Sequence, residues 1–359
     1  MRKHYIDNLR WMTLLILIPY HAAMAWNVWG EPNYVFFDGS KVLSSIVVFF
    51  SPFFMPLLFV LAGMSTRFAL QKRTCREYLS ERVKKLLIPF LFGTVVLMPV
   101  MTYIADRFNC AYGGGFFEHY GVFFGKFTDL TGADGGFSVG QFWFLLYLFV
   151  ISAVSVLIIK LIKRIVRTEK ALPFPAVILL GLPLPALSEL VSIGGKSLIE
   201  YTYLFLLGYY IFSDDVIIQK AEKYRWLTLA AGLVSGVLDV YLFLWSDSEH
   251  ALLNNAAKYV SEWSMILALL GLSKRYLDFS GKISTYMKTR SFLFYIYHFI
   301  CVVLLQYLLY PVLGGSKAVF YTVTVLGAYI MTFALCEISI RIPFLCFLTG
   351  TKSDKNPCL

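Results

Sequence analysis

Charged residues are scarce in this chain of 359 residues: they make up 15% of it, whereas hydrophobic residues make up 58%. Soluble domains carry roughly a quarter charged residues, so the shortage argues against an ordinary soluble enzyme or binding domain. The apolar residues cluster in runs such as SSIVVFFSPFFMPLLFVLAG. A run of roughly 20 apolar residues is what a helix needs to cross a bilayer. The sequence therefore predicts an all-α, polytopic membrane protein.

Several signatures of soluble enzymes are also missing. The sequence contains no G-x-S-x-G element and no P-loop, which excludes the usual serine-hydrolase and nucleotide-binding motifs. The six cysteines show no disulfide framework or metal-ligand spacing. No two of the five histidines have ligand spacing on one helix, so we predict no metal site. No internal repeat is visible, which argues against a transporter built from duplicated halves.

Ten transmembrane helices are expected from the apolar runs. The fifth contains four prolines, so it must be broken or packed against neighbours that satisfy the freed carbonyl groups. No change in composition separates a soluble domain, and we expect a single transmembrane domain over residues 1–350 with a short cytoplasmic tail at 351–359. The ten helices are expected near 9–29, 42–66, 86–105, 142–160, 173–191, 198–213, 226–245, 255–272, 291–313 and 317–345.

Basic residues are unevenly distributed among the predicted loops. With ten spans and a cytoplasmic N-terminus, 26 of the 32 Lys and Arg residues fall on the inner side and 6 on the outer side. This is the positive-inside bias, so both termini are expected in the cytoplasm. The net charge of +10 is then a consequence of topology, and no nucleic-acid partner is expected. The basic inner surface would attract membrane lipids of negative charge and anionic cytoplasmic ligands.

The first predicted helix carries ionisable side chains that a lipid-facing helix would avoid. Arg10 and His21 are 11 residues apart, which is three turns plus about 20° at roughly 100° per residue. They therefore share one helix face, and Asp7 shares it because it stands three residues before Arg10. This stripe predicts the lining of a cavity that runs from the inner surface outward. The alternative is that Arg10 snorkels to the interface and His21 is a packing residue.

The pattern D-x-L-R followed by ten residues and a histidine, here Asp7, Arg10 and His21, resembles the membrane-bound acyltransferase family 3. FVLAG resembles the family's F-x-L-x-G element. SERVKKLLIPF resembles its R-x-x-R-x-x-x-P element, with Lys85 in place of the second arginine.

Two later elements extend this resemblance. VGQFWFLLYL resembles H-L-W-F-L-x-x-L, with Gln141 in place of the histidine, and FLFYIYHFI resembles the late Y-x-x-H element, with His298. The L-A-G and R-x-x-K-x-x-x-P versions of the earlier elements are most similar to the glucan-succinylating branch of the family. Helices one to four and the ninth carry the resemblance, and the middle of the chain carries little of it.

The resemblance implies an O-acyltransferase that moves an acyl group of the acetyl or succinyl class from cytoplasmic acyl-CoA to a hydroxyl of an extracytoplasmic glycan or similar acceptor. Arg10, Arg82, Lys84 and Lys85 would bind the CoA phosphates at the inner mouth. His21 would act as general base on the acceptor hydroxyl, with Arg10 and Asp7 beside it on the stripe. A covalent acyl-histidine step is an alternative.

Five further residues are candidates for binding the substrate: Trp143, Gln141, His298, Glu262 and Glu337. Trp143, His298 or a tyrosine could donate a hydrogen bond to the oxyanion. Either carboxylate could orient His21 or bind acceptor hydroxyls, or could serve as a structural partner for a polar residue on a neighbouring helix.

A proton-coupled transporter or exporter is the alternative function, since buried histidines and carboxylates also form proton relays. The missing repeat and the basic inner mouth argue against it. Either function would place the chain in a prokaryotic plasma membrane. The largest external segment, 106–140, is rich in glycine and aromatic residues, and its histidine, His119, is expected at the surface.

Overall fold

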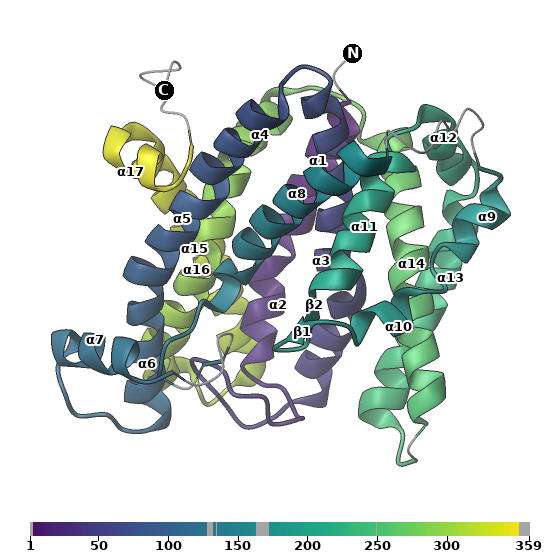
Figure 1. Cartoon of the computed structure of the whole chain (residues 1–359). Helices are drawn as coiled ribbons and strands as arrows, with labels where there is room; N and C mark the ends of the chain where they lie inside the picture. Colours follow the sequence, from purple (N-terminus) through teal and green to yellow (C-terminus); the bar gives the residue numbers. More distant parts are fainter. Residues whose placement is uncertain (1–2, 128–131, 134, 163–171, 249, 352–359) are drawn as a thin grey trace. The chain divides into compact units, whose positions relative to one another are not determined.

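The computed structural model describes residues 3–127, 132–133, 135–162, 172–248 and 250–351, and most of this chain is helical (Figure 1). A single hairpin of two antiparallel strands, β1 (Ser192–Ile193) and β2 (Lys196–Ser197), is the only sheet in these ranges. The helices are α1 (His4–Leu15), α2 (Leu17–Met24), α3 (Lys41–Leu70), α4 (Cys75–Arg82), α5 (Ile88–Phe92), α6 (Met98–Asn109), α7 (Phe116–Gly125), α8 (Trp143–Ile162), α9 (Phe174–Leu179), α10 (Leu184–Ser188), α11 (Leu198–Tyr210), α12 (Asp215–Lys223), α13 (Arg225–Val240), α14 (Ala251–Tyr276), α15 (Lys282–Leu313), α16 (Lys317–Arg341) and α17 (Pro343–Leu348).

Six helical segments of the described chain are long and apolar enough to cross a membrane. This agrees with an all-α membrane protein. The count of ten spans, the side of the termini and the single domain over 1–350 stay predictions, and from residue 352 the predicted tail lies outside the described residues. The six segments are Lys41–Leu70, Cys75–Asn109, Gly140–Leu161, Arg225–Trp245, Lys282–Leu313 and Lys317–Arg341.

The expected first helix, 9–29, is interrupted at Ile16 and ends at Met24. The cause is Pro19, which has no N–H to donate to the carbonyl four residues earlier. That carbonyl, on Leu15, accepts instead from the hydroxyl of Tyr329 at 2.7 Å. The Pro19 carbonyl itself accepts from the Tyr321 hydroxyl at 3.1 Å. Tyr329 of α16 thus satisfies the backbone carbonyl that the proline leaves open, as an apolar environment requires, and Tyr321 of α16 adds a second bond to this turn.

The proline-rich fifth run is broken, as the sequence predicts. It forms the short helices α9 and α10 with turns between them. Neighbouring side chains satisfy carbonyl groups of this segment: the Trp263 indole donates to Val177 O at 3.2 Å, and the Tyr203 hydroxyl donates to Leu180 O at 2.9 Å.

The helical segment Cys75–Asn109 is longer than the expected third helix, 86–105. It joins α4, α5 and α6 through two wide π-helical turns, η1 (Val83–Leu87) and η2 (Gly93–Leu97). A π-turn accommodates one extra residue in an α-helix and leaves carbonyl groups less well paired. One such carbonyl, on Val95, accepts a hydrogen bond from the Tyr120 hydroxyl of α7. The basic residues of α4 and η1 therefore continue directly into a membrane-length helix.

The chain divides into two compact units. The first contains residues 1–13, 48–81 and 148–285, and the second contains 14–47, 82–147 and 286–359. In the first unit two glycines bring α3 and α11 into backbone contact. A Cβ at Gly63 would lie 1.9 Å from Phe205 O, and a Cβ at Gly208 would lie 2.1 Å from Val60 O. Small residues that allow such close approach are typical of helix packing in membranes.

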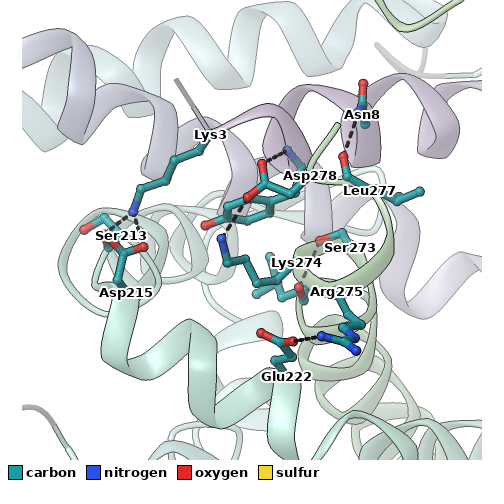
Figure 2. Close-up of polar contacts among 12 residues, drawn as sticks. Lys3, Asn8, Ser213, Asp215, Glu222, Ser273, Lys274, Arg275, Leu277 and Asp278 are labelled. Atoms are coloured by element: carbon teal, nitrogen blue, oxygen red, sulfur yellow. Dashed lines mark hydrogen bonds and ion pairs between the residues drawn. The ribbon is translucent and has the colours of Figure 1, made fainter. Parts of the chain in front are cut away.

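Polar contacts tie the N-terminal residues of the first unit to the loop before α15 and to α12 (Figure 2). The Asn8 side chain donates to Leu277 O at 2.7 Å, and the Lys3 ammonium pairs with the Asp215 carboxylate at 2.6 Å. These bonds set the start of α1.

Aromatic side chains form much of the core of the second unit. The Trp26 ring lies 4.7 Å from the Phe37 ring and 5.5 Å from the Phe320 ring. The Asn109 side chain donates to Asn33 O at 3.0 Å, which ties the loop after α2 to the end of α6.

Candidate active site

His21 lies on α2 in the second unit, and its imidazole is surrounded by aromatic rings. It stacks on Phe299 with ring centroids 3.9 Å apart and an interplanar angle of 21°. Its centroid lies 5.2 Å from that of His298 and 5.2 Å from that of Tyr20. Unlike most of its neighbours, His21 is only half-buried. The site therefore holds two imidazoles side by side in apolar surroundings.

His298 lies on α15 and is fully buried. Its Nδ1 lies 2.7 Å from the carbonyl oxygen of Tyr295. A carbonyl oxygen can only accept, so Nδ1 must carry the hydrogen in this contact. In the neutral ring Nε2 then presents a lone pair. No hydrogen-bond partner for this Nε2 exists among the described residues, so the structure leaves a buried acceptor open.

Gln141 is brought to the same region by Tyr295. The Tyr295 hydroxyl donates to the backbone carbonyl of Gln141, while the Tyr295 backbone carbonyl holds His298. The side chain of Gln141 is buried, and neither its Nε2 nor its Oε1 meets a partner in the part of the chain that the structure describes. Buried polar groups without partners are uncommon in folded proteins and call for an explanation such as a ligand or a water.

A glycine and an aromatic contact position Gln141 on its short 3₁₀ turn, Gly140–Phe142. Gly140 has a φ of +44°, and a Cβ there would lie 2.6 Å from the Met98 side chain and 2.9 Å from the Tyr34 hydroxyl. Phe142 fills the space beside Gly93, where a Cβ would lie 2.3 Å from its ring. The Tyr34 ring in turn lies 5.4 Å from the Phe299 ring, which stacks on His21.

Trp143 follows this turn as the first residue of α8. It is half-buried and meets the Tyr147 ring edge to face at 5.2 Å. Trp143 therefore belongs to the same unit as His21.

The three predicted cations of the basic element also lie in the second unit. Arg82 ends α4, and Lys84 and Lys85 lie in the π-turn η1. Both lysines are exposed and Arg82 is half-buried. The Gly350 backbone after α17 packs here, since a Cβ at Gly350 would lie 2.8 Å from Lys84 O. Three cations within four residues provide a strongly positive surface for phosphate groups.

Arg10 and Asp7 belong to the first unit. The Arg10 guanidinium donates to the Ser65 hydroxyl at 2.6 Å and to Leu61 O at 3.4 Å, and it lies 3.4 Å from the Asp7 carboxylate. Both side chains remain partly exposed. The pair on the predicted stripe is thus in contact, with α3 as its anchor.

The two predicted carboxylates occupy different surroundings. Glu262 lies in the first unit, is 1% exposed and shares a hydrogen bond with the Glu200 carboxyl group. Glu337 lies in the second unit, where its carboxylate pairs with Arg290 at 3.0 Å and accepts from the Tyr286 hydroxyl at 2.9 Å. These contacts supply the structural partners that the sequence left as an alternative.

The prediction for His119 is wrong. It is fully buried on α7, and its Nε2 lies 2.8 Å from the Asp106 carboxylate of α6. Apolar and aromatic neighbours such as Tyr103 and Tyr112, at 5.5 Å and 5.2 Å, enclose the ring. A histidine among many aromatic residues in a Gly-rich segment gives no periodic sign of burial, so the contact with Asp106 could not be foreseen.

The second unit therefore contains two neighbouring imidazoles, His21 and His298, and the buried carboxamide of Gln141. Among the described residues no group of three His, Cys, Asp or Glu side chains could hold a metal ion. Sequence reasoning missed Tyr295, which links two of these residues, and Phe299, which packs on His21. Tyr295 is the tyrosine of the Y-x-x-H element, so its presence was visible although its role was not.

The sequence matches a family model described as an acyltransferase domain over residues 3–340. Among curated proteins it is similar to glucans biosynthesis protein C of Salmonella paratyphi B and of Salmonella agona. Each is 22% identical over 389 residues, which covers 98% of this chain and 95% of the relative. No solved structure matches the chain.

Proposed function

Because the chain belongs to the acyltransferase 3 family and is an acyltransferase, we propose that it transfers an acyl group from cytoplasmic acyl-CoA to a hydroxyl of an extracytoplasmic glycan, with His21 as general base. The observation that supports this most is the half-buried His21 ring, which is stacked on Phe299 and lies beside the second imidazole of His298. The relatives named for glucan biosynthesis favour a glucan as the acceptor.

The chemistry needs one proton carrier. A nitrogen of His21 takes the proton of the acceptor hydroxyl while the oxygen attacks the thioester carbonyl. The new carbon–oxygen bond forms, the carbon–sulfur bond breaks, and the imidazolium returns the proton to the leaving thiolate. A neutral imidazole suits both steps, and a positioned base of this kind contributes about 10²–10⁴-fold to the rate.

The donor would be held by cations. In the second unit Arg82, Lys84 and Lys85 would bind the CoA phosphates. The same role for Arg10, with Asp7 beside it, stays a prediction from the sequence. Lys85 replaces an arginine of the family element, so it would act as a point charge and not as a bidentate ligand. Acyl groups of the acetyl or succinyl class fit the branch that the sequence resembles.

The acceptor would meet the remaining predicted residues. Trp143 would offer an aromatic face near the start of α8, and Gln141 and His298 would offer polar atoms. Glu262 and Glu337 are less favoured than the sequence suggested, because each is already bonded to a neighbouring side chain.

The test is a matched pair of histidine variants in membranes from cells that express the protein. His21→Ala should abolish the acyl mass added to surface glycans while the protein accumulates normally. His250→Ala, which removes an exposed histidine at the start of α14, should leave acylation unchanged. Full acylation by His21→Ala would refute the role of His21, and a lack of any acyl product from the unmodified protein with acetyl- and succinyl-CoA would refute the proposed donor.

A further inference from the structure

Three polar side-chain atoms in the second unit are buried and have no hydrogen-bond partner among the described residues. They are Nε2 and Oε1 of Gln141 and Nε2 of His298, and the two residues are 6% and 0% exposed. Leaving a buried polar atom without a partner costs roughly 1–3 kcal/mol. Gln141 and His298 are 157 positions apart in the sequence, so chance proximity along the chain does not explain the coincidence.

Tyr295 holds both residues in place. Its backbone carbonyl fixes Nδ1 of His298 at 2.7 Å, and its hydroxyl fixes the backbone carbonyl of Gln141. The side chains themselves are left to face something else. The His298 ring lies 5.2 Å from the His21 ring, so a ligand bound to Nε2 of His298 would lie next to the proposed base.

The hydrogen-bonding character of the three atoms is complementary to a hydroxyl-bearing, uncharged ligand. Gln141 offers an amide donor and an amide acceptor. His298 offers only an acceptor on Nε2, because its hydrogen is committed to Tyr295 on Nδ1. Neighbouring hydroxyls of a sugar both donate and accept. A phosphate or carboxylate ligand would be bound less well, because only the Gln141 amide can donate to it and the lone pair on Nε2 of His298 would repel its oxygen atoms.

We propose that Gln141 and His298 form a neutral subsite that binds hydroxyl groups of the acyl acceptor beside His21. This rests on the proposed function and adds a substrate class, an uncharged sugar, and a role for His298 as acceptor of a hydrogen bond. It also excludes neutral His298 as the donor to the oxyanion, which the sequence had left open.

Binding can be measured without any acyl transfer. The probe is a neutral β-linked glucose oligosaccharide added to the purified full chain in detergent, without acyl-CoA, and the readout is the melting temperature. The unmodified protein should melt at a higher temperature at saturating oligosaccharide. Gln141→Leu should show a clearly smaller shift at the same concentration, with an apparent Kd raised about thirtyfold, since two hydrogen bonds of about 1 kcal/mol each are removed.

Gln306→Leu is the matched control. Gln306 is equally buried, and its Nε2 donates to Ala22 O at 3.0 Å, so this variant should melt earlier and still show the shift. An absent shift in the unmodified protein, or an equal shift in Gln141→Leu, would overturn the subsite.

The acyl-transfer assay separates the subsite from the proposed function. With acyl-CoA present, Gln141→Leu should raise the KM for the oligosaccharide about thirtyfold and leave the KM for the donor unchanged. A fall in kcat at an unchanged acceptor KM would assign Gln141 to the oxyanion and overturn the subsite. A sugar-dependent melting shift in a protein without transferase activity would refute the proposed function and retain the subsite.

Discussion

The contact between α3 and α11 predicts a large effect of a single methyl group. In Gly63→Ala the new Cβ would stand 1.9 Å from Phe205 O, whereas ordinary contact begins at 3.4 Å. The obstacle is backbone, which cannot rotate away as a side chain does, so the two helices must separate by about 1.5 Å. Separation would also loosen the stacked pair Phe59 and Tyr201, whose rings lie 4.5 Å apart.

We expect a loss of about 2–3 kcal/mol for Gly63→Ala, the upper part of the range for overpacked cores. For a chain of 359 residues, with an unfolding entropy of about 2.1 cal/mol/K per residue, this corresponds to a melting temperature lower by roughly 3–4 °C. The assay is thermal unfolding of the purified protein in detergent. Gly208→Ala should cost a similar amount, because its Cβ would lie 2.1 Å from Val60 O. The double variant should cost less than the sum, since both methyl groups push the same two helices apart.

Gly327→Ala on α16 is the control, because its Cβ would meet only the flexible Leu305 side chain at 3.2 Å. It should be neutral or gain about 0.5–1 kcal/mol from helix propensity. A melting temperature of Gly63→Ala within about 1 °C of the unmodified protein would refute the backbone contact.

Three other predictions concern charge and buried hydroxyls. Arg82→Ala should raise the KM for acyl-CoA and change kcat less, and an unchanged donor dependence in steady-state kinetics would remove Arg82 from the donor site. Burial alone would raise the pKa of Asp278, but hydrogen bonds from the Lys274 ammonium and from the backbone N–H of Tyr5 hold it below its ordinary value of 3.8. The stability that Asp278 contributes is therefore present above about pH 4 and is lost as the pH falls through its lower folded-state pKa. In Asp278→Asn the melting temperature should therefore fall less steeply as the pH is lowered below about 4. An unaltered dependence of the melting temperature on acid pH would contradict the assignment. Tyr5→Phe removes a buried hydroxyl for which no partner exists among the described residues, so the free energy of unfolding should stay within about 0.5 kcal/mol or rise, and a loss above 1 kcal/mol in denaturant titrations would show a missed bond.

Features with local causes were predictable from the sequence. The apolar runs located the long helices, and the prolines located the break between α9 and α10. The interruption of the first helix has an equally local cause in Pro19. Its stabilisation does not, because the carbonyl that Pro19 frees is satisfied by Tyr329, which is 314 residues away. The pattern of apolar residues around Leu15 or around Tyr329 does not indicate that the two residues form a hydrogen bond.

The candidate site divides in the same way. His21, Gln141 and His298 were each identified by residue type and motif, and all three lie in the second unit. What connects them is Tyr295, through a bond that spans 154 residues. The tautomer of His298 is also invisible in the sequence, because only the hydrogen bond between Nδ1 and the Tyr295 carbonyl decides which ring nitrogen is an acceptor. Sequence patterns identify such residues but not their tautomers.

The two wide turns between α4 and α6 have a consequence for how chain length can vary. Each turn takes up one residue more than a regular helix would, while the helical faces on either side keep their directions. Removing a single residue within Gly93–Leu97 would thus convert the π-turn to regular α-helix and leave the side-chain directions on both sides unchanged. The same deletion a few positions later would rotate the side chains of the following helix by about 100° about its axis. Insertions and deletions among homologous chains should accordingly collect at these two points and be rare between them.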